Sequence, residues 1–365
     1  MNKLNYIDST RGLAILMVMI VHSSHKIPDL SSIAYWTAAY GQMGVQLFFV
    51  ASAFTLSLSA QRRKGEERAM SKYWIRRIAR IAPMYYLGIL LYFLISVIEG
   101  YLSNGDISIL PKYSWDNILS NVFFVHGFYP PANNNIVPGG WSIGTEMAFY
   151  LIFPFLFSLA NRRLKNKSVR VLIWMISGYV IAQFLVLLLN NYGLTLARNS
   201  FLYYNLANQL SLFVIGIGYY FYWSNRKRQG RALLDLLAVT SLTVFAIWMM
   251  QQRLDWLYCL IPFVSGLSFI FLIELLRKVE VLNQRLLIRI GQMSYSMYIL
   301  HFFFVDLVRI VLFPMLSEKI TPETLFLAVF IATVGTTYVA ALVTERFVEK
   351  PFVKLGRRWI KKLDV

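Results

Sequence analysis

Long apolar stretches separated by short polar segments make up most of this sequence. About ten of them approach the ~20 mostly apolar residues that a helix needs to cross a bilayer. They lie near residues 11–27, 41–60, 84–99, 141–160, 171–190, 203–224, 232–251, 256–276, 291–313 and 324–344. Few charged residues interrupt them, whereas a soluble helix of this length would carry a charged face. The pattern predicts an all-α integral membrane protein, a bundle of about ten transmembrane helices.

Two of the polar segments are long enough to have structure of their own. The segment 100–140 contains an apolar part, 118–128, which is too short to span a bilayer, so we expect it to be interfacial or re-entrant. The basic tail at about 345–365 is expected to form an amphipathic helix on the inner leaflet. The sequence therefore predicts a single membrane domain over residues 1–365.

The distribution of basic residues predicts the orientation of this bundle. Apolar residues make up 57% of the chain and charged residues 15%, and the net charge is +18. Alternating the ten spans puts most of the 36 Lys and Arg residues on the side of the N-terminus. The exceptions are Lys26, Lys112, Arg198, Arg253, Arg309 and Lys319. Since cytoplasmic loops carry the excess of Lys and Arg, we expect a multi-pass plasma (inner) membrane protein with both termini cytoplasmic and no nucleic-acid partner.

Titratable side chains inside the predicted spans are few, and such residues by default indicate function because each costs ~2.5–3.5 kcal/mol on insertion scales. Arg11 and His22 are eleven residues apart. At ~100° and ~1.5 Å per residue, both lie on one helix face, ~16 Å apart along its axis. Arg11 is then expected at the cytoplasmic mouth and His22 beyond the middle of the membrane.

Two further spans bring polar residues to a similar depth. Glu146 follows Trp141 by five residues, so we expect it ~8 Å inside the outer face. Ser294, Tyr298 and His301 recur at spacings of four and three and form one polar stripe. The convergence of His22, Glu146 and His301 from three helices predicts one site.

Each of these residues also has a plainer interpretation. An intramembrane histidine, such as His22, His25 or His301, can simply hydrogen-bond a neighbouring helix. Glu146 can cap its helix near the lipid interface, and the basic cluster 76–80 can be only a topology anchor. No close metal-ligand spacing is present, and Cys259 is the only cysteine, so we expect no metal and no internal disulfide.

Six short motifs follow one another along the chain. They are Asp8–Leu16 with His22, Gly44–Phe54, Arg76–Pro83, Trp141–Glu146 with Phe149 and Tyr150, Ser294–His301, and Glu345–Pro351. In kind and order they resemble the motifs of the membrane acyltransferase family 3. Ala53 departs from the pattern, because the family usually has Gly there. No esterase-like domain follows the last span, so we expect the stand-alone form of the family.

The resemblance implies transfer of an acyl group, typically acetyl from cytoplasmic acetyl-CoA, to a hydroxyl of an extracytoplasmic glycan such as O-antigen, capsule or exopolysaccharide. Acetyl-CoA would be the donor substrate, and the partners would be acyl-CoA, the glycan and the bilayer. A basic mouth would bind the donor phosphates through Arg11, Arg76, Arg77 and Arg80.

The same resemblance implies roles for the polar residues deeper in the bundle. His22 would be the general base, or would carry the acyl group transiently. Glu146 would orient His22 or bind the sugar, and His301 with Tyr298 would position groups or stabilise the oxyanion. The acceptor would contact Trp141, Tyr298 and Ser294.

A transporter or flippase for a sugar-linked or lipid-linked substrate is the alternative, because intramembrane His, Glu and Arg also line permeation paths. The sequence has no internal repeat of the kind that many transporters show. The two functions differ in one observable, since a transporter would leave the acyl-CoA thioester intact.

Overall fold

The computed structural model describes residues 4–25, 27–104, 111–164, 168–190, 200–224, 231–252 and 255–364. Lys3, Lys26, Arg198, Arg253 and most of the predicted 191–202 connection lie outside these ranges. Every regular element within them is a helix, which confirms the predicted all-α class.

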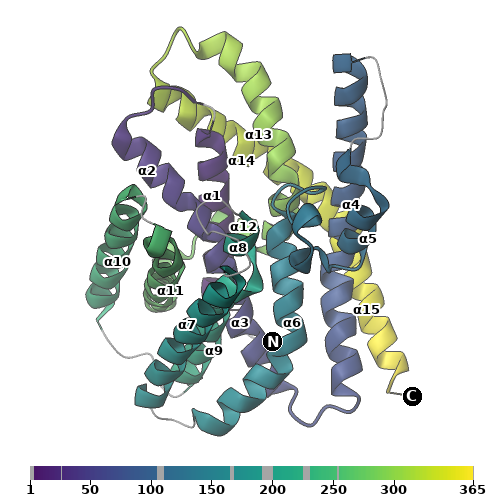
Figure 1. Ribbon diagram of the computed structural model, residues 1–365, viewed down its shortest axis with the longest axis vertical. Coiled ribbons are helices and arrows are strands. Elements are labelled where there is room, and N and C mark those ends of the chain that lie inside the picture. The colour runs from purple at the N-terminus through teal and green to yellow at the C-terminus, as the bar shows by residue number, and fades with distance from the viewer. Residues whose placement is uncertain are drawn as a thin grey trace.

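Ten long helices in the described part of the chain each overlap one of the ten predicted spans (Figure 1). They are α1 (Asn5–Ser24), α3 (Gly44–Arg62), α4 (Ala69–Asn104), α6 (Gly140–Arg163), α7 (Ser168–Asn190), α9 (Leu206–Ser224), α10 (Ala232–Gln252), α11 (Asp255–Lys278), α13 (Ser294–Leu316) and α14 (Pro322–Thr344). The shorter elements are α2 (Ser32–Tyr40), α5 (Trp115–Val122), α8 (Ser200–Tyr204), α12 (Arg285–Gln292) and α15 (Lys350–Lys362), with single turns at Gly41–Met43, Pro111–Tyr113, His126–Phe128, Pro130–Ala132, Glu280–Leu282 and Glu345–Glu349.

Most of these helices are suited to a bilayer, and the protein is an integral membrane protein. In the described residues, 8 spans are long and apolar enough to cross a membrane. α1 and α9 are as long but are not among them, because polar residues lower their hydropathy. Both are central: α1 packs against α3, α11, α12, α13 and α14, and α9 against α3, α6, α7 and α11. Helices surrounded by protein tolerate polar side chains that lipid would not.

The predicted start of the third span, near residue 84, is wrong. α4 is 36 residues long, begins at Ala69 and continues through Pro83. The basic cluster therefore lies on a helix instead of in a connection. Its first half is supported by α15, which comes so close that a Cβ on Gly356 would lie 2.6 Å from the Cβ of Ala79. This packing offsets the backbone hydrogen bond that Pro83 removes.

The basic tail forms the predicted helix, and it lies alongside the lower half of α4 (Figure 1). Lys72 of α4 forms an ion pair with Asp364, and the Arg68 Nη1 donates to the carbonyl oxygen of Leu363 at 2.7 Å. Arg357 and Lys361 remain exposed on its outer face. Contact of this face with the inner leaflet stays a prediction.

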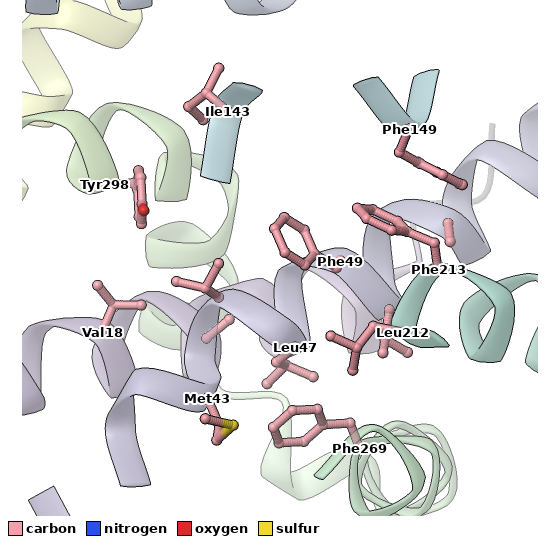
Figure 2. Close-up of a cluster of buried hydrophobic side chains, with 14 of the residues drawn as sticks. Val18, Met43, Leu47, Phe49, Ile143, Phe149, Leu212, Phe213, Phe269 and Tyr298 are labelled. Atoms are coloured by element: carbon pink, nitrogen blue, oxygen red, sulfur yellow. The ribbon is translucent and has the colours of Figure 1, made fainter. Parts of the chain in front are cut away.

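Aromatic packing joins α3, α6 and α9 in the interior of the helix bundle (Figure 2). The ring centroid of Phe213 on α9 lies 4.7 Å from that of Phe49 on α3 and 3.9 Å from that of Phe149 on α6. Phe49 and Phe149 are almost fully buried. Because such interlocking rings allow little movement, they fix the positions of the polar side chains that project from α3 and α6.

Candidate active site

Two neighbouring cavities lie along the face of α1 that carries Arg11 and His22. The first, which we call the arginine cavity, has a volume of about 80 Å³ and is lined by Arg11, Arg77, Arg80 and Glu146 among others. The second, the histidine cavity, has a volume of about 570 Å³ and is lined by His22. The predicted common face of α1 is thus confirmed, but its two polar residues serve different spaces.

Cations and one carboxylate are brought together in the arginine cavity by α1, α4 and α6. The Arg11 Nη2 donates to Thr55 Oγ1 of α3 at 3.2 Å, and its Nη1 lies 3.9 Å from a carboxylate oxygen of Asp8. Arg77 and Arg80 enter from α4. Guanidinium groups in a partly desolvated space bind phosphate or carboxylate strongly, so this cavity suits an anion.

Glu146 belongs to the arginine cavity and not to the histidine cavity. Its Oε1 accepts hydrogen bonds from Ser52 Oγ and from Tyr150 OH, each at 2.5 Å. The spacing of Glu146 and Tyr150 by four residues puts both on one face of α6. Glu146 therefore lines the cavity next to that of His22, and a single site formed by Glu146, His22 and His301 stays a prediction.

Arg77 and Arg76 point in different directions, because consecutive residues on a helix are ~100° apart. The Arg77 Cζ lies 6.0 Å from the ring centroid of Tyr73 and 5.7 Å from that of Tyr150, which are cation–π positions. Arg76 faces away from the arginine cavity and forms a bidentate ion pair with Glu66, at 3.0 and 2.5 Å. Only three of the four predicted donor-binding arginines share one cavity.

The histidines meet at the histidine cavity. The ring centroid of His22 lies 5.3 Å from that of His301 and 4.4 Å from that of Phe302 on α13. His25 lies 5.1 Å from His22, at the exposed end of α1. His22 is partly exposed to the cavity, so its imidazole can reach a bound molecule there.

His301 is fully buried behind His22. Its Nδ1 lies 2.7 Å from the carbonyl oxygen of Tyr298, which is a suitable acceptor if that nitrogen carries the proton. Its Nε2 has no hydrogen-bond partner in the described residues. A ring fixed by a backbone contact, with an unpaired second nitrogen, can support a neighbouring imidazole or a bound group.

Tyr298 and Val45 line both cavities and form the wall between them. The Tyr298 hydroxyl donates to the carbonyl oxygen of Gly139 at 2.9 Å and accepts from Ser142 Oγ at 2.8 Å. Gly139 has φ +74°, and a Cβ there would lie 2.8 Å from that hydroxyl. Only glycine fits this left-handed, crowded position, so the start of α6 is tied to α13 at the wall.

Aromatic and amide side chains cover the far side of the histidine cavity. Trp141 stacks on Tyr204 with ring centroids 4.2 Å apart and an interplanar angle of 15°. Asn134, Asn135 and Gln46 add amide groups. Flat aromatic surfaces with neutral hydrogen-bonding groups suit a polar, uncharged ligand.

The remaining predicted residues divide between the cavities. Ser294 lines the arginine cavity, whereas Trp141 lines the histidine cavity and Tyr298 lies between them. Sequence reasoning gave no role to Ser52 and Tyr150, the partners of Glu146. Both stand in the motifs quoted above, and a Tyr four residues after an intramembrane Glu was the available signal. Within the described ranges, no three His, Cys, Asp or Glu side chains could hold a metal ion together.

His126 supports the start of α6 from the 100–140 segment. It is fully buried, and its Nε2 lies 2.9 Å from the carbonyl oxygen of Gly140 and 3.2 Å from the hydroxyl of Tyr85. A Cβ on Gly144 would lie 2.8 Å from the same nitrogen. Burial lowers the pKa of His126 below its usual range. It therefore lies outside both cavities as a neutral packing residue.

Comparison with known proteins identifies relatives and a family for this chain. The chain is 24% identical to the peptidoglycan O-acetyltransferase OatA of Listeria monocytogenes, over 96% of the chain and 56% of that protein. It is 21% identical to the O-acetyltransferase OatA of Staphylococcus aureus, over 96% of the chain and 57% of the relative. The chain thus spans little more than half the length of these relatives. No solved structure matches it. The acyltransferase domain family matches residues 4–345, nearly the whole chain, and the chain therefore belongs to that family.

Proposed function

We propose that this protein is an O-acyltransferase that passes an acetyl group from acetyl-CoA to a hydroxyl of a cell-envelope polysaccharide. One observation carries the proposal: a cationic cavity and a neutral, aromatic cavity meet at Tyr298 and Val45. Arg11 and His22 lie on the same helix, and Arg11 faces the cationic cavity while His22 faces the neutral one. An anionic donor and a neutral sugar need such different surroundings. The names of the relatives support O-acetylation, and one of them points to peptidoglycan as an acceptor to test.

The size of the arginine cavity limits which part of the donor enters it. It is the smaller of the two cavities, at about 80 Å³ against 570 Å³. The thin pantetheine arm suits so narrow a space better than the bulky nucleotide does. The arm would pass Arg11 and Arg80 and bring the thioester to the wall at Tyr298. The excess of basic residues at this end favours a cytoplasmic orientation for it.

The acceptor would lie in the histidine cavity, with a sugar ring against Trp141. His22 takes the proton from the acceptor hydroxyl as its oxygen attacks the thioester carbonyl carbon. The new C–O bond forms and the C–S bond breaks, and the proton passes to the departing sulfur to give free CoA. The Tyr298 hydroxyl, which in the free protein donates to the carbonyl oxygen of Gly139, would turn its proton to the thioester carbonyl oxygen as negative charge develops there. His301 fixes the position of the His22 ring from behind.

The decisive experiment measures free thiol released from acetyl-CoA by the purified protein in lipid, with and without extracted envelope polysaccharide or peptidoglycan. We expect release that depends on the glycan, together with radiolabelled acetyl on the glycan. Movement of substrate across vesicles with the thioester intact would contradict the proposal and favour a transporter.

A further inference from the structure

A third cavity lies directly beside the arginine cavity. It has a volume of about 350 Å³, and we call it the vestibule. Four basic residues line it: Arg63, Lys64, Arg76 and Arg77. Arg77 also lines the arginine cavity, so this side chain is part of the wall that the two cavities share.

The vestibule contains what the arginine cavity lacks for a nucleotide. Its volume is about four times larger at 350 Å³ against 80 Å³. One wall is aromatic, with Tyr73 stacked on Phe153 at 6.2 Å and Phe153 stacked on Phe157 at 5.6 Å between ring centroids. Flat rings beside several cations match a phosphorylated purine nucleotide, whose base stacks and whose phosphates pair.

Glu66 already occupies the best anion position in the vestibule. Its two carboxylate oxygens accept from Nη1 and Nη2 of Arg76 at 3.0 and 2.5 Å, and the two side chains are 21% and 19% exposed. The hydrogen bond from Arg76 lowers the pKa of Glu66, so the carboxylate is charged at neutral pH. A phosphate group would use the same pair of donors in the same planar geometry.

Glu66 is also in a place from which it can move. It lies in the connection between α3 and α4, next to Gly65, which has φ +86° and open space where a Cβ would be. Rotation about Gly65 can withdraw the carboxylate without unwinding either helix. The two side chains are each about one-fifth exposed, so a multiply charged ligand can reach Arg76 and compete with Glu66 for it.

We propose that the vestibule binds the phosphate-bearing nucleotide end of the acyl donor, and that Glu66 is a built-in competitor that occupies the phosphate position until the donor displaces it. This inference rests on the proposed function, because it takes a CoA thioester as the donor. Glu66 then sets the donor affinity without contacting the reacting atoms. It lets CoA leave after transfer, since the carboxylate returns to Arg76 when the phosphate departs.

The test compares CoA affinities of purified variants in nanodiscs of neutral lipid, measured by calorimetry. We expect Glu66→Gln to tighten CoA binding about three- to tenfold, which corresponds to the loss of one partly screened ionic competitor. Glu67→Gln is the matched control, because Glu67 is the next residue, is exposed and does not line the cavity. Arg76→Ala should weaken CoA binding by roughly tenfold or more, and adding Glu66→Gln to it should have no further effect.

Pantetheine, which has no phosphate, provides the second arm, and its affinity should be unchanged by Glu66→Gln. Equal CoA affinity in Glu66→Gln, Glu67→Gln and the parent protein would overturn the inference while glycan-dependent thiol release stands. If Glu66→Gln strengthens binding of phosphatidylglycerol but not of CoA, the vestibule takes a lipid headgroup and the inference is overturned. Failure of every variant and the parent to bind CoA would overturn the proposed function together with it.

Discussion

The arginine cavity and the histidine cavity lie next to each other yet have opposite chemistry. Arg11, Arg77, Arg80 and Glu146 line the first. The described lining of the second contains histidines, amides and aromatic rings but no Asp, Glu, Lys or Arg. The first cavity is small and the second is seven times larger, at 80 and 570 Å³.

This difference indicates how the work is divided between them. Fixed charges are useful where an anion must be bound in a partly desolvated space. They are unfavourable where an imidazole has to accept and release a proton, because a neighbouring carboxylate or cation would favour one protonation state. The wall at Tyr298 keeps the charged groups apart from His22. Variants on either side should therefore alter different kinetic constants.

The largest expected effect is on the histidine side. His22→Ala should lower glycan-dependent acetyl transfer by ~10²–10⁴-fold, the usual contribution of a general base. CoA affinity should be unchanged, because His22 does not line the arginine cavity. His25→Ala is the comparison within the same cavity, and we expect it to cost much less, because the His25 ring lies exposed at the end of α1, 5.1 Å from that of His22. Near-normal transfer by folded, membrane-inserted His22→Ala would remove His22 from the mechanism and with it the proposed division.

The next effect is on the arginine side. Arg80→Gln should raise the KM for acetyl-CoA by about 10- to 100-fold, since it removes a charge-assisted contact worth ~1.5–3 kcal/mol. The KM for the glycan should stay the same. Arg170→Gln serves as a control, because Arg170 is exposed and lines neither cavity. An unchanged donor KM would reduce Arg80 to a topology residue.

The sequence predicted most of the fold. The correct predictions concern features that depend only on the residues within a single helix. The ten apolar stretches each overlap one of ten long helices, and Arg11 and His22 share a face of α1 because helix geometry requires it. The start of α4 was missed because its first half is stabilised by α15, a contact that is distant in sequence.

The site was predicted less completely, because it depends on how helices rotate against one another. Residue spacing predicted that Glu146 lies at a similar depth in the membrane to the histidines. Depth alone does not determine the direction in which a side chain points from its helix. The rotation of α6 directs Glu146 to Ser52, and the ~100° between consecutive residues of α4 turns Arg76, but not Arg77, away from the arginine cavity. No pattern in one segment contains that information.

A smaller effect is expected at the aromatic wall of the histidine cavity. Trp141→Ala should raise the KM for the glycan about five- to tenfold, because it removes the ring that stacks on Tyr204 and faces the cavity. The CoA affinity should not change. Trp248→Ala is a suitable control, because Trp248 is exposed on α10 and does not line the cavity. A rise in the donor KM instead would mean that the donor also enters the histidine cavity.

The smallest expected effect concerns His126, the buried residue that supports the start of α6. The pKa of His126 is lowered by burial, so below its ordinary value of ~6.5 the unfolded chain binds a proton that the folded protein does not. Folded stability should therefore fall as the pH drops from about 7 towards the lowered pKa, by at most ~1.4 kcal/mol per pH unit from this group.

His126→Gln should show a smaller loss of Tm between pH 7.5 and 5.5 than the parent protein. His25→Gln, a change at an exposed histidine, provides the comparison. Equal pH dependence in His126→Gln and the parent would mean that the buried ring can accept a proton in place. The start of α6, and Trp141 with it, would then respond to pH through a residue that lines neither cavity.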